Sequence, residues 1–127
     1  MKYLLDVNAL IAWAHQGSPH AVPFHRWKKN VGAGDLATCA ITELGFVRVS
    51  MLSFQLDLPA AAGALAVLKA EIGHFLPALP PPVFPPWVTS HRHTTDAYLC
   101  QVAAIHGVRL ATFDTDIRDR IALLIAR

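Results

Sequence analysis

Short apolar runs and stretches of helical periodicity alternate along most of the chain. The first apolar run, 3–5, ends at Asp6, and apolar residues then recur at helical spacing over 10–14. Gly17 follows as a typical residue at the end of a helix. The first unit predicted by the sequence is therefore a strand, a carboxylate and a helix.

The same order returns after a polar interval. Residues 36–39 are predicted to form a second strand, and a helix follows in which Ile41, Leu44 and Val47 fall on one side. Glu43 lies in the early turns of this helix. A second carboxylate is thus expected just beyond the end of a second strand.

A third helix is predicted from Asp57 to Gly73, because Asp is a frequent helix cap and an apolar stripe runs up to the glycine. After it, six of the nine prolines fall within 77–86. Proline removes a backbone donor, so neither a central helix nor a central strand accepts this density. We expect this segment to be a long surface connection within one domain.

The last part of the chain repeats the alternation. A helix is expected from Thr95 to Gly107, and 109–113 follows as a strand that ends at Asp114. The run 121–125 is apolar without alternation, which is typical of a buried final strand. Strands alternating with helices predict a three-layer α/β fold, with a central parallel sheet of about five short strands flanked by helices.

Composition narrows this picture without changing it. The chain has 127 residues, of which 54% are hydrophobic and 16% charged, so disorder is excluded and one domain over 1–127 is expected. The net charge of +2 permits nucleic-acid binding but does not argue for it.

Cys39 and Cys100 are predicted to be buried free thiols, since they lack the spacing of a metal or redox pair. The longest apolar stretch, 58–68, is too short for a membrane span, so we expect a cytoplasmic protein that does not bind membranes.

The candidate chemistry lies in acidic residues at the ends of elements. Asp6 and Asp114 follow predicted strands, Glu43 and Asp96 lie in first turns of predicted helices, and Asp116 is two residues beyond Asp114. Any one of them is as well explained as a helix cap. In an open parallel sheet, however, sites form beyond the carboxyl ends of the strands, where these residues would meet.

A meeting of several carboxylates needs a cation. Two carboxylates about 6 Å apart repel by roughly 3 kcal/mol at an effective dielectric constant near 20. Oxygen ligands suit Mg²⁺, for which Mn²⁺ can substitute, and an ion of this kind can activate water and stabilise the leaving oxygen of a phosphodiester. The set therefore points to metal-assisted phosphodiester hydrolysis.

Four segments together give a family resemblance. They are LLDVNAL at 4–10, ATCAITELGFVR at 37–48, TDAYL at 95–99 and LATFDTD at 110–116. In this order they resemble a PIN domain, and most closely the VapC-type toxins of bacterial type II toxin–antitoxin systems. The resemblance implies a metal-dependent endoribonuclease that acts on structured RNA, such as tRNA or ribosomal RNA, and is silenced by a cognate antitoxin.

The resemblance also assigns roles to particular acids. The catalytic and metal-binding acidic positions of the family fall on Asp6, Glu43, Asp96 and Asp114, and Asp116 matches an accessory acid that varies among members. The dense prolines of the segment 77–86 depart from the family pattern. That departure affects the expected shape of a loop facing the RNA rather than the acidic set.

Polar and basic residues complete the expected site. Asn8 and Thr112 match residues that brace the acids of the family, a role suited to amide and hydroxyl groups beside carboxylates. Candidates for contacts to RNA phosphates are Arg48, Arg92, Arg118, Lys28 and Lys29, although each can equally be a solvated surface charge. Arg48 is favoured among them because its helix also carries Glu43.

Two further interpretations concern other functions and partners. An aspartyl-phosphate phosphatase needs Asp where this chain has Asn8, so that activity is excluded, whereas a non-catalytic RNA- or protein-binding module on the same scaffold stays open as the alternative. A zinc site at His91 and His93 is not favoured, because no thiolate and no third ligand lie near them in the sequence.

The high apolar content predicts a homodimer that also buries an amphipathic segment of an antitoxin.

Overall fold

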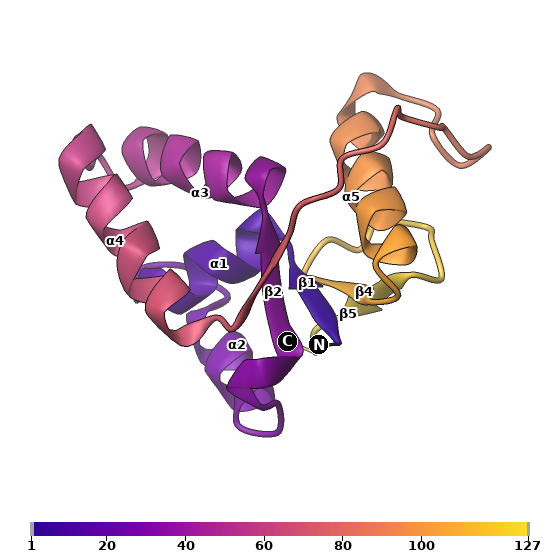
Figure 1. The fold of residues 1–127 in the computed structure, drawn as a ribbon. Helices are drawn as coiled ribbons and strands as arrows, with labels where there is room; N and C mark the ends of the chain where they lie inside the picture. Colours follow the sequence, from indigo (N-terminus) through magenta and orange to yellow (C-terminus); the bar gives the residue numbers. More distant parts are fainter. Residues whose placement is uncertain (1, 127) are drawn as a thin grey trace.

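The chain is described by a computed structural model over residues 2–126, in which strands and helices alternate as expected (Figure 1). Within these residues five strands pair in parallel to form one sheet, in the order β3-β2-β1-β4-β5. The strands are β1 (Tyr3–Leu5), β2 (Leu36–Cys39), β3 (His74–Leu76), β4 (Arg109–Thr112) and β5 (Ala122–Leu124).

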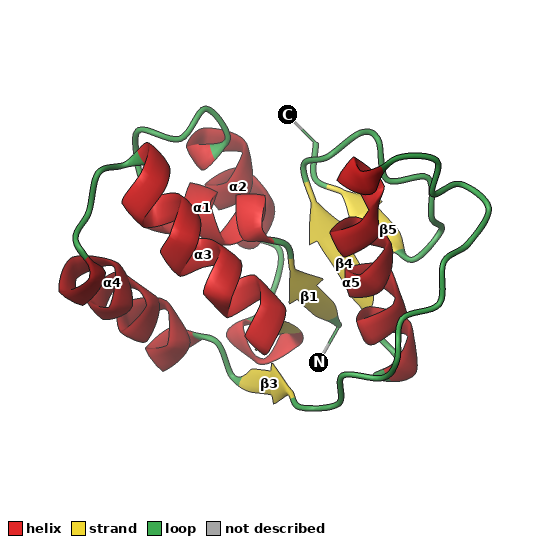
Figure 2. Cartoon of the chain, turned by 90° about the horizontal axis from the view of Figure 1, so that it is seen from above, coloured by secondary structure: helices red, strands yellow, loops and turns green. Residues whose placement is uncertain are grey.

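The helices cover both faces of this sheet. Four of them lie on one side, and the fifth lies alone on the other (Figures 1 and 2). This arrangement confirms the predicted three-layer α/β fold with a central parallel sheet. The α-helices are α1 (Val7–Ala14), α2 (Ala21–Lys28), α3 (Ala40–Ser53), α4 (Leu58–Glu71) and α5 (Thr94–Ile105), and short 3₁₀ turns span Ala33–Asp35 and His91–His93.

The side chains of β1 alternate between two hydrophobic clusters, as the pleat of a strand requires. Leu5 packs with α1, α3 and α4, while Leu4 packs with Leu99 and other residues of α5. Both leucines are fully buried. The central strand therefore has a core on each side, and its carboxyl end points to the gap between the two helical layers.

Helix α3 packs unusually close to α1. A Cβ placed on Gly45 would lie 2.5 Å from Cγ2 of Val7, a separation that real Cβ atoms do not show. The buried side chains of α3 are Thr42, Phe46 and Ser50, and Ser50 Oγ lies 2.9 Å from Nε2 of His15. The close approach thus fixes how α3 is rotated beside the end of β1.

Ile41, Leu44 and Val47 share one side of α3, as the spacing predicts, and line one hollow together. That side is not the most buried one, since Leu44 is 69% exposed. Thr42 and Ser50 take inner positions, where their hydroxyl groups find partners in Cys39 and His15. Hydrophobic spacing alone therefore does not show which side of α3 faces the core.

The proline-rich segment is a surface connection, as predicted, and it is tied to α5. The Tyr98 hydroxyl donates to the Pro80 carbonyl over 2.6 Å, and the Gln101 amide donates to the Pro81 carbonyl over 2.9 Å. Gln101 also accepts a bond from the Val83 backbone N–H. Side chains of α5 supply the hydrogen bonds that a strand partner would otherwise give.

Two elements lie outside the sequence prediction, and one differs from it. Helix α2 and strand β3 were not predicted, and β5 is an edge strand with Leu124 51% exposed rather than a buried one. The predicted extent 1–127 includes Met1 and Arg127, which lie outside the described residues. Among residues 2–126 no helix has the length and apolar character needed to cross a membrane.

The two cysteines are buried free thiols, as the sequence predicts. Cys39 ends β2 and Cys100 lies in α5, and both belong to the cluster between the sheet and α5. They contribute to packing in that cluster.

Candidate active site

Asp6 lies directly after β1 and begins α1. Its Oδ1 accepts a hydrogen bond from the Val7 backbone N–H over 2.8 Å, and its Oδ2 accepts one from the Thr112 hydroxyl over 2.7 Å. Only 5% of the residue is exposed. Burial raises the pKa of this carboxyl group more than the two hydrogen bonds lower it, and the charge of Asp114 raises it further.

Asn8 and Thr112 connect the end of β1 to the end of β4. The Asn8 amide donates to the Thr112 hydroxyl over 3.3 Å, and its carbonyl accepts from the Phe113 backbone N–H over 3.2 Å. The Thr112 hydroxyl also accepts from the Asp114 backbone N–H over 3.0 Å. These bonds position the carboxylates at the ends of two neighbouring strands, which is a bracing arrangement.

Asp96 approaches the same point from the opposite helical layer. It lies in the first turn of α5, and it is half-buried. Burial raises its pKa to about 7, with further contributions from the charges of Asp6, Asp114 and Asp116 and from a hydrogen bond to Asp114. Near neutral pH the Asp96 carboxyl group is therefore partly protonated, and the hydrogen bond to Asp114 favours its protonated form.

These three acids line one cavity of about 530 Å³. Asp6, Asp96 and Asp114 lie on its wall together with Arg48 and His20. The wall of the cavity thus carries both acidic groups and the guanidinium group of Arg48. Its size falls within the range of small-ligand sites.

Asp116 lies at the edge of this group. Its backbone N–H donates to Oδ1 of Asp114 over 2.8 Å, and its own side chain is exposed. Its charge contributes to the raised pKa of Asp96 but its side chain does not line the cavity. It is thus close enough to act on the acids through space.

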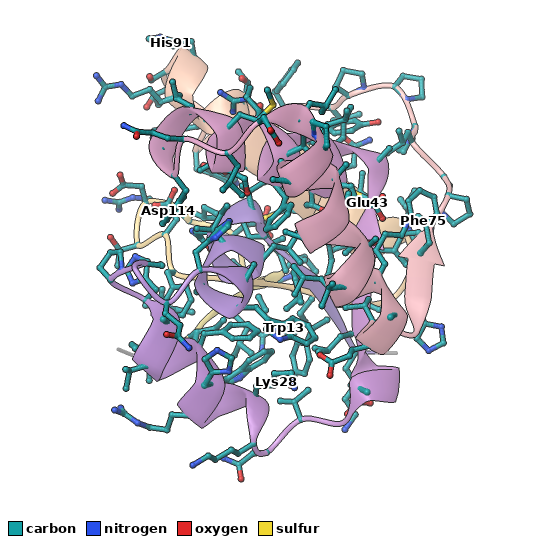
Figure 3. All side chains as sticks on the ribbon, turned by 90° about the vertical axis from the view of Figure 1, so that its left-hand side faces the viewer. Trp13, Lys28, Glu43, Phe75, His91 and Asp114 are labelled. Carbon is teal, nitrogen blue, oxygen red and sulfur yellow. The ribbon has the colours of Figure 1, made fainter. Side chains whose placement is uncertain are left out.

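Glu43 is not brought into this cavity. One carboxylate oxygen accepts from the Thr38 hydroxyl over 2.6 Å, and the other lies 3.1 Å from Nζ of Lys69 on α4. Around α3, Glu43 stands about 140° from Arg48, which does line the cavity. Figure 3 shows Glu43 beside Phe75, well away from Asp114. The expected four-acid set is therefore divided into three acids at the cavity and one paired with lysine.

The three predicted RNA-binding arginines have different surroundings. Arg48 lines the cavity, whereas Arg92 is exposed in the 3₁₀ turn that precedes α5. Arg118 is exposed in the loop between β4 and β5. Of these three arginines, only Arg48 lines the same cavity as the acids.

His20 is a cavity residue that the sequence prediction missed. It is the residue just before α2, and its ring is stacked on Phe113 with a centroid distance of 4.4 Å and an interplanar angle of 6°. Phe113 comes immediately before Asp114. The contact joins residues 93 positions apart, and the uneven spacing of the histidines gave no local signal for it.

The acids suit Mg²⁺ better than a metal held by a complete protein cage. Across residues 2–126 no three His, Cys, Asp or Glu side chains are grouped to hold one ion, which also leaves no zinc site at His91 and His93. Mg²⁺ typically uses only one or two carboxylates and keeps several waters. Burial is the main cause of the raised pKa values of Asp6 and Asp96, and neighbouring carboxylates raise both further. A cation would offset both effects, so these residues fit such an ion.

The PIN domain family model matches residues 3–122. Ribonuclease VapC38 of Mycobacterium tuberculosis is 36% identical over 121 residues, which covers 90% of this chain and 86% of the relative. Ribonuclease VapC39 of the same species is 36% identical over 129 residues, covering 94% and 93%.

A solved structure supports the fold alone. The crystal structure of PAE2754 from Pyrobaculum aerophilum is similar with a TM-score of 0.57 and 20% identity, covering 98% of this chain and 90% of that one. The family model and the relatives each span most of the sequence. The chain therefore belongs to the PIN domain family, as a VapC-type member.

Proposed function

We propose that this chain is a metal-dependent endoribonuclease that hydrolyses RNA phosphodiester bonds, and the toxin of a toxin–antitoxin pair. The observation that carries the proposal is the convergence of Asp6, Asp96 and Asp114 on one cavity, with the pKa of Asp96 raised to about 7. Relatives named ribonucleases support the same activity. Structured RNA, tRNA or ribosomal RNA, is the substrate class that the family resemblance implies.

Mg²⁺ is the proposed cofactor, and Mn²⁺ is expected to substitute for it. The ion would lie in the cavity lined by Asp6, Asp96 and Asp114, held directly by one or two of these carboxylates and by waters, with Asp116 close by. When bound, the ion supplies charge neutralisation at the phosphate and lowers the pKa of water to make a nucleophile. A bound cation would favour the ionised form of Asp96.

The chain's own residues prepare the cavity for this step. Thr112 and the Val7 backbone fix both oxygens of Asp6, so this carboxylate needs little reorganisation. Asn8 holds the end of β4 beside it. Arg48 offers a guanidinium group that could bind a phosphate of the RNA within the same cavity.

The test is cleavage of purified cellular RNA by the wild-type protein and by Asp96→Asn. We expect cleavage with Mg²⁺, none in excess EDTA, and a loss in Asp96→Asn that exceeds the roughly 10–100-fold typical of residues behind the ligands. Asp57→Asn is the matched control, because Asp57 caps α4 and does not line the cavity, and Asn caps about as well. Unchanged cleavage after metal removal would contradict the mechanism, and no cleavage by any variant would favour the non-catalytic binding module.

A homodimer and a cognate antitoxin are proposed as partners. Large apolar side chains are exposed on neighbouring helices, among them Leu44, Met51 and Leu52 of α3 and Val67 of α4. Exposed apolar groups of this size favour protein contacts. Light scattering at micromolar concentration tests the dimer, and a monomer there would contradict it.

A further inference from the structure

Helix α2 carries a row of exposed residues that the proposed catalytic step does not use. Four exposed residues share one side of this helix because of their spacing. They are Val22, His25, Arg26 and the C-cap residue Lys29. Three of the four are basic or titratable to a cation. The helix contains no acidic residue.

The charges on this side are not neutralised by neighbours. Within residues 2–126 the ion pair joins Lys69 to Glu43, so Arg26 and Lys29 have no carboxylate partner in the described chain. Lys28 differs, because its ammonium group lies 4.6 Å from the centre of the Trp13 ring. The helix thus directs one lysine to an aromatic ring and leaves two cations facing solvent.

This surface adjoins the catalytic cavity. A second hollow of about 510 Å³ is lined by Gln16, Val22, Arg26 and Lys29, among others, while Ser18 and His20 from the intervening loop line the cavity that holds the acids. The linings of the two hollows are therefore adjacent along the chain, at the turn that leads into α2.

We propose that this side of α2 binds the sugar–phosphate backbone of the RNA substrate as the strand leaves the catalytic cavity. The inference rests on the proposed ribonuclease function. The cavity's own acids repel a polyanion, so cations in addition to Arg48 are needed to hold the strand beyond the cavity. Helix α2 is about 12 Å long, enough to follow more than one phosphate of a strand.

A structural role for the same cations predicts a different result. Positive side chains near the end of a helix stabilise its dipole, and this would make Arg26 and Lys29 contributors to folding alone. Their removal would then lower the melting temperature and leave RNA binding unchanged. The experiment must therefore measure both.

The test is fluorescence anisotropy of a labelled single-stranded RNA oligonucleotide of mixed sequence, titrated with Arg26→Gln/Lys29→Gln in EDTA over a range of salt. Each phosphate contact on a single strand contributes about 0.7 to the slope of log K against log salt, so the slope should fall by about 1.4. At about 0.1 M salt the affinity should fall roughly tenfold. In cleavage assays KM should rise more than kcat changes.

The matched control is Lys28→Gln/Arg120→Gln, which removes the same two charges. Lys28 faces Trp13, and Arg120 is exposed in the loop before β5. We expect this variant to keep the wild-type slope to within about 0.5. Melting temperatures of all variants, measured in the same buffer, identify any effect that comes from folding.

Four outcomes would overturn the proposal. An unchanged slope and affinity in Arg26→Gln/Lys29→Gln, with normal cleavage, would remove α2 from the RNA path while the ribonuclease function stands. Equal losses in both double variants would show a general charge effect instead of a binding surface. Poly-glutamate, titrated under the same conditions, tests an acidic protein partner. If Arg26→Gln/Lys29→Gln binds RNA normally but loses binding to poly-glutamate, the surface belongs to such a partner. If the wild-type protein neither binds nor cleaves RNA, the proposed function itself fails.

Discussion

Asp96 and Glu43 occupy equivalent places in their helices, the first turns of α5 and of α3. Asp96 faces other carboxylates, and its pKa is raised to about 7. Glu43 faces the ammonium group of Lys69 and the hydroxyl group of Thr38. An acidic residue in the first helical turn thus lies among other carboxylates in one layer of the fold, and is paired with a lysine in the other.

This difference separates two physical roles for an acid at a helix start. A crowded carboxylate destabilises the protein without a cation and gains from binding one. A satisfied carboxylate contributes to packing of the helices and gains little from a metal. The comparison therefore predicts that replacement of each acid should act on different measurements.

The largest expected difference is in stabilisation by Mg²⁺. An ion at about one hundred times its dissociation constant should stabilise the native wild-type protein by about 2.7 kcal/mol. In a chain of this size that corresponds to a rise of about 10 °C in melting temperature. Asp96→Asn should lose this rise, and Glu43→Gln should keep it, as measured by thermal melts with and without Mg²⁺.

The opposite result for Glu43 would be equally informative. If Glu43→Gln loses the Mg²⁺ effect as fully as Asp96→Asn, then Glu43 leaves Lys69 to join the ion, and the original sequence prediction of a four-acid set holds. A loss in neither variant would separate the acids from metal binding altogether.

A smaller effect is expected from pH without metal. The Asp96 carboxyl group titrates near 3.8 in the unfolded chain and near 7 in the folded one, so the folded state holds an extra proton between these values. Stability should therefore fall as pH rises from about 4 to about 7 and then level off. Because Asp96 is half-exposed, solvent screening reduces the expected change to about 1 kcal/mol.

Urea unfolding in EDTA at several pH values measures this change. Burial lowers the pKa of His15, which acts in the opposite direction because stability is then lost as pH falls below about 6.5. The quantity to compare is the difference between wild type and Asp96→Asn, which keeps His15 in both. A difference that is independent of pH would show that burial and the neighbouring carboxylates do not raise the pKa of Asp96.

The smallest effect is expected at the ion pair of Glu43. Lys69 is 46% exposed at its side chain and Glu43 14%, so Lys69→Gln should lower the free energy of unfolding by about 0.5–1 kcal/mol. A double-mutant cycle with Glu43→Gln isolates the coupling of the pair. Stronger Mg²⁺ binding in Lys69→Gln would mean that the lysine keeps Glu43 out of the site.

The three acids at the cavity could be predicted because they depend on topology more than on detail. Parallel strands bring their carboxyl ends to one edge, so Asp6 and Asp114 follow from the strands that precede them. Asp96 follows from the helix that covers the other face. The same reasoning located the sheet, most helices and the proline-rich connection.

The position of Glu43 could not be predicted because it depends on rotation of α3. That rotation is set by the contact of Gly45 with Val7 and by the polar partners of the inner residues, none of which gives a periodic signal. The partner Lys69 is 26 residues further along the chain. The spacing of residues within one helix cannot predict a contact between side chains this far apart in the sequence.

Helix α2 and strand β3 were missed for a local reason. Helix α2 is eight residues long and contains Pro23, and its mixture of apolar and basic residues has no clear stripe. Strand β3 has three residues, two of them exposed. Elements this short are stabilised by what they pack against rather than by their own sequence.

The central place of β1 in the sheet has a consequence for synthesis. Strand β1 pairs with β4 in a register that matches Leu5 with Ala111, and the Asp6 backbone N–H donates to the Ala111 carbonyl. At about 5–20 residues per second, a ribosome needs roughly 5–20 seconds to reach Ala111 after it has made Leu5. Throughout that interval the nascent chain carries Asp6 without its neighbours, so the cavity cannot assemble beside the ribosome until the protein is nearly complete.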